Sequence, residues 1–386
     1  MQTIIQIIFW VALFGIFWAN IGYPISILIL GKIIKRNNKK DYSYRPTVTI
    51  MIVAHNEEKV IRKKLDNVLK VDYPKSKLEV LVSSDNSTDK TNEIVKQFIN
   101  KHKKDKIRLY EVKERKGKTN AQNEAAKTVK SEILVMTDAN ALLDKNSVKE
   151  LVSSFGKNVA YVTGRLVYSN SADSMTSNTE NTYWDLDTRI REIESRIQTI
   201  TAGNGALYAC KTNEYHDFEP IKCHDSSMPL YYALHGKRAI ANHDAIAYEK
   251  AGENDKDEFK RKIRMNRVIV NAILPTIKVL NVFRYKWFTY FYLGHRTLRY
   301  LLWLNHILLF VSNAIIMFYN SLFIIPFVIQ LLVCAFAVAK HLFKMKNKLF
   351  NLCSYYCMTV LAQLIGVIKT ITHKNKPFWE KAESTR

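Results

Sequence analysis

The segment SEILVMTDAN, residues 131–140, joins a short apolar run to an acidic and an amide side chain. The apolar run has the length and the branched side chains of a buried β-strand, and Asp138 and Asn140 follow where such a strand would end. In open α/β sheets, ligands bind beyond the carboxyl ends of the strands. The segment therefore predicts a sheet with a polar site at its carboxyl edge.

Three other strand-like runs come before this segment and alternate with helix-like ones. The predicted strands are residues 47–54, 78–84, 107–112 and 132–137, and the predicted helices are residues 57–70, 89–99 and 120–129. This alternation predicts a parallel sheet with helices on both faces. The strands are followed in order by HNEE, SDNSTD, ERKGKTN and TDAN, so four polar strand ends are expected to converge on one cleft.

The two ends of the 386-residue chain are strongly apolar, although its formal net charge is +23. Residues 4–34 are uncharged except near their end and are long enough to cross a bilayer. Residues 301–339 are almost unbroken apolar sequence, with a hairpin turn expected at Asn320 and Ser321. The lysines that follow both segments predict, by the positive-inside rule, a cytoplasmic middle part.

A further apolar stretch covers residues 349–368, and more lysines follow it. If this stretch crossed the membrane completely, those lysines would lie outside the cell, which conflicts with the positive-inside rule. A spanning, a re-entrant and an interfacial placement all stay open for it. The basic charge does not predict nucleic-acid binding, since the lysines flank apolar segments or spread over helix faces, which suits an anionic leaflet. The five cysteines include no Cys-x-x-Cys pair, which argues against a zinc ribbon and a disulfide framework.

Several segments resemble, in order, the nucleotide-sugar motifs of family 2 glycosyltransferases with the GT-A fold: VTIMIVAHNEE, VLVSSDNSTDKT, KGKTNAQNEA and VMTDAN. TAGNGALYA, HDSSMPLYYALHGKRAIANHDAIAYE and EFKRKIRMNR continue the resemblance, which spans residues 47–267. The membrane-anchored branch with the cellulose and hyaluronan synthases is the nearest comparison. The resemblance implies an α/β fold with a Rossmann-like mixed sheet, the GT-A fold, together with N- and C-terminal transmembrane helices.

This resemblance and the apolar segments together predict five parts of the chain. They are an N-terminal transmembrane anchor (residues 1–34), a cytoplasmic GT-A domain (45–280), an interfacial amphipathic segment (281–300), a C-terminal membrane-associated region (301–372) and a basic tail (373–386).

The resemblance implies a donor site at the strand ends. Asp85 matches an acidic position that contacts the uridine, and the alternative is an N-cap for the following helix supplied by Asp85, Ser87 or Thr88. Glu57, with Ala54 at the end of the first strand, matches the position near the ribose or base, and the alternative is an exposed glutamate in the first turn of a helix. Lys118 matches a lysine that follows a glycine turn and faces the nucleotide, where an ammonium suits a diphosphate.

Asp138 and Asn140 stand where the family typically has Asp-x-Asp. In the family these residues hold a divalent cation, Mg²⁺ or Mn²⁺, on the donor diphosphate. An amide can ligate through its oxygen but adds no charge, so metal binding is expected to be weaker or to use another carboxylate. The alternative is a turn-forming pair without a ligand.

Asp225 stands at the position of the base that takes the proton from the acceptor hydroxyl, and His224 replaces the first acid of the family's pair. His224 is either a neighbour that tunes this base or a loop residue. The acceptor candidates are Tyr183 and Trp184, for stacking on a sugar, and Gly203, Asn204 and Gly205, for a close approach of backbone.

EFKRKIRMNR resembles a degraded Gln-x-x-Arg-Trp segment, with Arg261 at the glutamine position, Arg264 at the arginine and Met265 at the tryptophan. These arginines would hold the leaving diphosphate. The alternative is an interfacial helix face that meets lipid phosphates.

The resemblance implies a multi-pass, metal-dependent inverting glycosyltransferase at the cytoplasmic face of the cell membrane. It would move a sugar from a nucleotide donor, a UDP-sugar by resemblance, to a saccharide or lipid-linked acceptor in surface or capsular polysaccharide synthesis. Two alternatives stay open: a single-addition transferase onto a lipid carrier, and a catalytically degenerate scaffold subunit. No motif determines the donor sugar, the product length or the oligomeric state.

Overall fold

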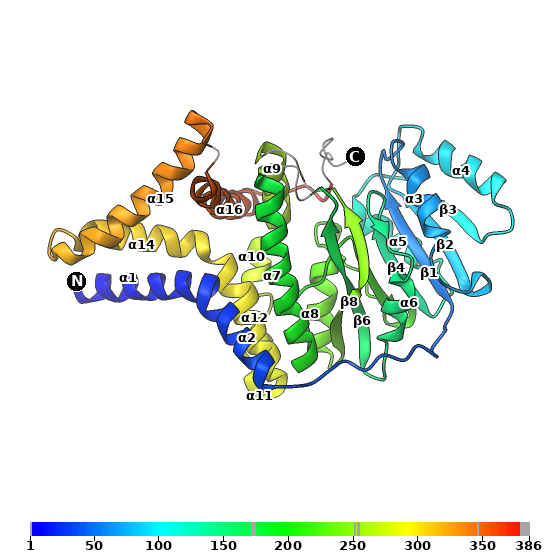
Figure 1. The fold of residues 1–386 in the computed structure, drawn as a ribbon, viewed down its shortest axis with the longest axis horizontal. Helices are drawn as coiled ribbons and strands as arrows, with labels where there is room; N and C mark the ends of the chain where they lie inside the picture. Colours follow the sequence, from blue (N-terminus) through cyan, green and yellow to red (C-terminus); the bar gives the residue numbers. More distant parts are fainter. Residues whose placement is uncertain (1, 171–174, 251, 253–254, 346, 379–386) are drawn as a thin grey trace. The chain divides into compact units, whose positions relative to one another are not determined.

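The computed structural model describes residues 2–170, 175–250, 252, 255–345 and 347–378 (Figure 1). The described chain forms two compact units. The α/β unit holds residues 34–170, 184–250 and 376–378, and the helical unit holds the other described residues. Each unit is described by itself below.

The α/β unit is built on one mixed sheet (Figure 1). Its strands in the described chain are β1 (Val48–Ala54), β2 (Leu78–Ser84), β3 (Ile107–Glu111), β4 (Ile133–Asp138), β5 (Leu142–Leu143), β6 (Val159–Tyr168), β7 (Leu207–Lys211) and β8 (Arg238–Glu249). Their order is β3-β2-β1-β4-β7-β6-β8-β5. The first four strands of the chain are parallel, as the alternation of strands and helices predicts, and β7 runs antiparallel to both β4 and β6.

Helices cover both faces of this sheet. They are α3 (Ile61–Val68), α4 (Thr91–Lys101), α5 (Lys118–Ala126), α6 (Ser147–Ser153), the last part of α7 (Met175–Ile197) and α8 (His224–Leu234). Alternate residues of β1 point to opposite faces: Ile50 and Ile52 pack with α3, α4 and α6, whereas Met51 and Val53 pack with α5 and α8. The period of two along the strand therefore gives the sheet a buried core on each face.

The helix predicted for residues 57–70 is shorter than expected and begins at Ile61. Asn56 has a positive φ of 54°, which ends β1 in a turn rather than in a helix. The amides of Val60 and Ile61 then donate to the Glu57 carbonyl oxygen. The HNEE motif is therefore a turn at the carboxyl end of β1.

The helical unit holds the apolar ends of the chain (Figure 1). Its elements in the described chain are α1 (Gln2–Phe17), a π-turn (Trp18–Gly22), α2 (Tyr23–Ile33), α9 (Asp255–Met265), α10 (Ile269–Ile273), α11 (Val282–Tyr285), α12 (Trp287–Tyr292), α13 (Leu298–Tyr300), α14 (Leu302–Ile316), α15 (Ile324–Phe343) and α16 (Lys348–Ile371), with short 3-10 and π-turns between them. In the described residues, three helical stretches are long and apolar enough to cross a membrane, or four if a pair bent by 59° is one span.

Packing within this unit explains two features of its sequence. Phe9 and Ala12 of α1 pack against Leu309 and Ile316 of α14, so these apolar helices bury part of their surface on each other. The polar residues of α16 are used inside the unit: Gln363 is buried, donates to the Arg299 carbonyl at 3.0 Å and accepts from the Trp303 amide at 3.3 Å. The polarity of residues 349–368 therefore serves helix packing.

Candidate active site

A glycine turn positions the first part of the site. Gly117 has φ +97°, a conformation that favours glycine, and directly precedes α5. The amide of Gly117 donates to Asp85 Oδ2 at 3.0 Å, and that of Lys116 donates to Asp85 Oδ1 at 3.2 Å. Burial raises the pKa of Asp85, although these two backbone donors oppose the shift. Asp85 therefore shapes the turn that leads to Lys118.

The helix-cap alternative for Asp85 is wrong in the structure. Helix α4 begins at Thr91, and the carboxylate of Asp89 accepts from the Thr91 amide at 2.9 Å. Ala54 ends β1, and its carbonyl accepts from the Asp85 amide at 2.9 Å. Glu57 is only 6% exposed, so the alternative of an exposed first-turn glutamate is wrong as well.

Lys118 is the first residue of α5, and its ammonium lies among carboxylates. Its Nζ donates to Asp138 Oδ1 and lies 3.4 Å from the Gly205 carbonyl oxygen. Burial lowers the pKa of Lys118, but the carboxylates of Asp138 and Asp225 outweigh burial and the net shift is upward. Lys118 is therefore a permanent positive charge at the carboxyl end of β4.

Asp225 lies in the first turn of α8, and its backbone carbonyl accepts from the Gly203 amide at 2.7 Å. A methyl group placed on Gly205 would lie 3.5 Å from Lys118 Nζ and 3.6 Å from Asp225 Oδ2. Both charged groups therefore face Gly205, and Asp138 is bonded to the same lysine. The structure brings together Asp138, Lys118, Asp225 and the Gly203–Gly205 loop, which are far apart in the sequence.

His224 is a buried core residue that begins α8, which corrects its interpretation as a loop residue. Its Nδ1 lies 2.8 Å from Gln122 Oε1, and its Nε2 lies 2.8 Å from the Tyr215 hydroxyl oxygen. Burial, with a smaller effect of the Lys118 charge, lowers the pKa of His224 to about 3. The imidazole is therefore neutral, and it anchors the helix end that carries Asp225.

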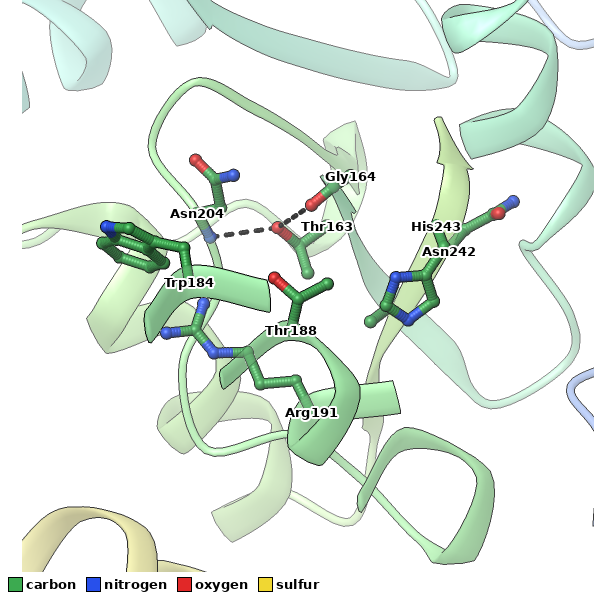
Figure 2. Close-up of a pocket in the computed structure, with 9 residues that line it drawn as sticks. Thr163, Gly164, Trp184, Thr188, Arg191, Asn204, Asn242 and His243 are labelled. Atoms are coloured by element: carbon green, nitrogen blue, oxygen red, sulfur yellow. Dashed lines mark hydrogen bonds between the residues drawn. The ribbon is translucent and has the colours of Figure 1, made fainter. Parts of the chain in front are cut away.

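A groove adjoins the glycine loop on its other side (Figure 2). Trp184, Thr188 and Arg191 of α7 line it with Asn204 and His243. Arg191 Nη1 donates to the Gly203 carbonyl at 2.7 Å, and its guanidinium lies 5.7 Å from the centre of the Trp184 ring. An aromatic ring beside hydroxyl and amide groups suits a sugar. The side chain of Tyr183, the other aromatic candidate, lies outside the described residues.

Asp138 and Asn140 are the candidate metal ligands at the end of β4. Among the described residues, no three His, Cys, Asp or Glu side chains lie close enough to hold a metal ion. The Asp138 side chain is 30% exposed, and the Asp138 carbonyl accepts from the Ala141 amide to close the turn that contains Asn140. One carboxylate and one amide fit a Mg²⁺ or Mn²⁺ site in which substrate phosphates and water supply the other ligands.

Arg261 and Arg264 lie on α9 in the helical unit. The guanidinium of Arg261 donates to both carboxylate oxygens of Glu258, at 2.7 and 2.9 Å. Glu258 is fully buried, so this ion pair is a structural element of the helical unit. The role of Arg261 and Arg264 at the leaving diphosphate stays a prediction.

Sequence reasoning missed two side chains that support the glycine loop. Arg191 forms an ion pair with Asp187 at 2.6 Å, and the spacing of four residues between opposite charges was the available signal. Tyr161 is fully buried under Gly203, and nothing in its strand-like surroundings points to that contact.

Gly203→Ala is expected to displace the loop beside Asp225, because the added methyl group would overlap the Tyr161 hydroxyl. We expect a loss of about 1–3 kcal/mol of stability, typical of overpacking, together with a loss of sugar transfer. Thermal unfolding and a transfer assay measure the two effects. Gly156→Ala is the matched control, since no atom lies within 4 Å of its added methyl group. Equal behaviour of the two variants would contradict the prediction.

Residues 49–214 match the family model described as Glycosyl transferase family 2. The chain is 37% identical over 120 residues to Probable glycosyltransferase YdaM of Bacillus subtilis (strain 168), a match that covers 30% of this chain and 27% of that protein. It is 33% identical over 110 residues to a beta-monoglucosyldiacylglycerol synthase of Nostoc sp., covering 28% of this chain and 24% of that protein.

A third relative is the poly-beta-1,6-N-acetyl-D-glucosamine synthase of Staphylococcus epidermidis, 26% identical over 120 residues, with 31% of this chain and 28% of that protein covered. The chain thus matches about a quarter of the length of these three relatives.

Among solved structures, a mannosyltransferase of Pyrobaculum calidifontis in complex with GDP-Man and Mn²⁺ has a TM-score of 0.72 at 23% identity. The likeness covers 96% of this chain and 100% of that chain, and it concerns the fold. It agrees with the mixed sheet and with the apolar helices at both ends of the sequence. Residues 49–214 of this chain are therefore a glycosyl transferase family 2 domain built on the GT-A fold.

Proposed function

We propose that this protein transfers a sugar, with inversion, from a nucleoside diphosphate-sugar to a hydroxyl group of a saccharide or lipid-linked acceptor. The observation that carries the proposal is the meeting of Lys118 and Asp225 at Gly205, with Asp138 bonded to the same lysine. Inverting transfer needs positive charge for the leaving diphosphate and, on the acceptor side, a base. Both kinds of group lie close to Gly205, a residue without a side chain.

The residues of the chain have distinct tasks in this reaction. The Lys118 ammonium binds the diphosphate and stays protonated, since the neighbouring carboxylates raise its pKa against burial. A divalent cation held by Asp138 and Asn140 would neutralise charge on the departing diphosphate. As the acceptor oxygen bonds to the anomeric carbon, the bond from that carbon to the phosphate oxygen breaks. Asp225 takes the proton of the acceptor hydroxyl, and the nucleoside diphosphate leaves.

The groove beside Gly203–Gly205 is the proposed acceptor subsite. Trp184 offers a ring on which a sugar can stack, and Asn204 joins the groove to the loop beside Asp225 (Figure 2). Two relatives are named for a glycolipid and for a polysaccharide product. We propose a saccharide or lipid-linked acceptor for this chain, in the synthesis of a surface or capsular polysaccharide.

The membrane placement is also a proposal. Within its described residues, the helical unit has three or four stretches that are long and apolar enough to span a membrane. Lysines follow the first of these in the sequence, which favours a multi-pass protein of the cell membrane with its α/β unit in the cytoplasm. The acceptor would then meet the donor at the inner leaflet.

A donor screen on the full chain in detergent or nanodiscs tests this function. UDP- and GDP-sugars are offered with Mg²⁺, with Mn²⁺ or with EDTA, and the released nucleoside diphosphate is measured with simple saccharides or membrane lipids as acceptors. We expect UDP release that needs a divalent cation. Binding without turnover for every pair would favour the scaffold alternative. Product length by mass spectrometry separates a single addition from polymerisation.

A further inference from the structure

Lys64, on α3, is a buried basic residue that takes no part in the proposed reaction. Its side chain is fully buried, and its amine donates to a hydroxyl group and to a backbone carbonyl oxygen. Burial lowers the pKa of Lys64 to about 7, although the charges of Asp138 and Glu249 oppose this shift. Burying an amine away from water is costly, so the position of Lys64 calls for a reason beyond packing.

The hydrogen bonds of Lys64 reach both ends of the turn that carries the metal candidates. Its Nζ donates to Thr137 Oγ1 at 2.8 Å and to the carbonyl oxygen of Ala141. These two residues enclose Asp138, Ala139 and Asn140 in the sequence. Lys64 therefore holds the Asp138–Asn140 turn from the core side.

The same contacts extend to the glycine loop. The Thr137 hydroxyl accepts from Lys64 and donates to the Ala206 carbonyl at 2.8 Å. Ala206 directly follows Gly205, where Lys118 and Asp225 meet. One lysine thus links the turn that carries Asp138 to the loop beside Asp225.

Asn67, a neighbour of Lys64 on α3, holds a different part of the chain. Asn67, one helical turn later, exchanges two hydrogen bonds with the backbone of Leu143, at 2.8 and 2.9 Å. Asn67 fixes the chain after the turn with a neutral side chain. Lys64 fixes the turn itself, through hydrogen bonds to Thr137 and to the Ala141 carbonyl oxygen.

We propose that Lys64 is a positioning residue of the donor site, which holds the Asp138–Asn140 turn in the geometry that binds a divalent cation and a diphosphate. This inference rests on the proposed function of Asp138. Residues that orient metal ligands from the next layer typically contribute 10- to 100-fold to metal affinity. Because Lys64 acts through the turn rather than on a ligand atom, we expect it to contribute about tenfold to metal affinity, which is the lower end of that range.

The test is binding, measured on the full chain by thermal shift and calorimetry with Mn²⁺ and either UDP or GDP. Lys64→Met should raise the Mn²⁺ concentration for half-maximal nucleotide binding about tenfold. Lys63→Met, an exposed position on the same helix, is the matched control and should leave it unchanged. A fall in melting temperature with an unchanged Mn²⁺ requirement would show a role in stability alone and overturn the proposal.

Thr137→Val provides a second test, also in case Lys64→Met fails to fold. It removes the hydroxyl between Lys64 and Ala206 but keeps a side chain of similar shape, so we expect a smaller shift in the same direction. In the double variant the two effects should not add, as expected for members of one hydrogen-bond network. Additive effects on the Mn²⁺ requirement, or no effect of Thr137→Val, would contradict the proposal that Lys64 acts through the Thr137 hydroxyl.

Asp138→Ala separates this inference from the proposed function. If Asp138→Ala binds the nucleotide with Mn²⁺ as the wild type does, the metal role of Asp138 fails, and the role of Lys64 fails with it. If Asp138→Ala loses this binding while Lys64→Met keeps it, only the inference on Lys64 is wrong.

Discussion

Asp225→Asn is expected to lower the turnover number by about 10² to 10⁴, the usual contribution of a general base, while the affinity for the donor stays near that of the wild type. The amide has the shape of the carboxylate but cannot take the acceptor proton. The backbone contact of Asp225 with Gly203 does not use the side chain, so the loop keeps its position. Loss of turnover without loss of donor binding is the signature of a base.

The measurement combines steady-state transfer with calorimetric binding of the nucleoside diphosphate. Asp217→Asn is the control, because Asp217 is a half-exposed carboxylate paired with Lys127 at 3.3 Å on the surface. It should keep both turnover and affinity. An active Asp225→Asn variant would mean that another group takes the proton.

Asp138→Ala is expected to abolish metal-dependent donor binding, with a fall in donor affinity of at least about 100-fold. This is more than the usual effect of replacing a residue that only orients a metal ligand. The substitution removes the one carboxylate among the candidate ligands and leaves Asn140, which brings no charge. It also removes the hydrogen-bond partner of Lys118, whose ammonium then loses its fixed position beside Gly205.

Donor binding with Mn²⁺ and with EDTA measures this effect. In the wild type, EDTA should weaken binding strongly, whereas in Asp138→Ala the two conditions should give the same weak affinity. Asp66→Ala is the control, since Asp66 is a half-exposed acid on α3 that pairs with Arg62 of the same helix at 3.4 Å. Unaltered binding by Asp138→Ala would remove the metal role from this position.

The parallel half of the sheet was predictable because its signals are local. The strands β1, β2, β3 and β4 coincide with the predicted runs to within one residue at each end, since branched apolar runs between turn residues already define a buried strand. The start of α3 was not predictable from spacing. Asn56 takes a positive φ, and its side chain accepts from the Thr88 amide at 2.7 Å, which is a contact with a distant segment.

In the site, too, the sequence predicted the residues but not their contacts. Asp138, Lys118 and Asp225 were singled out by their motifs, but a motif says nothing about which atoms meet. Their approach to Gly205 depends on the antiparallel strand β7, which brings the Gly203–Gly205 loop to the end of β4. The buried state of Glu57 and His224 also depends on segments far along the chain.

The sequence by itself determined the α/β pattern, the apolar ends and the polar residues at the strand ends, because each of these follows from side chains a few positions apart. The tertiary structure alone decided that the carboxylates of Asp138 and Asp225 both raise the pKa of Lys118, that His224 is neutral and that Lys64 is bonded to Thr137, next to Asp138. Burial and electrostatic surroundings are sums over residues that only folding brings into contact, so they cannot be read from the order of residues along the chain.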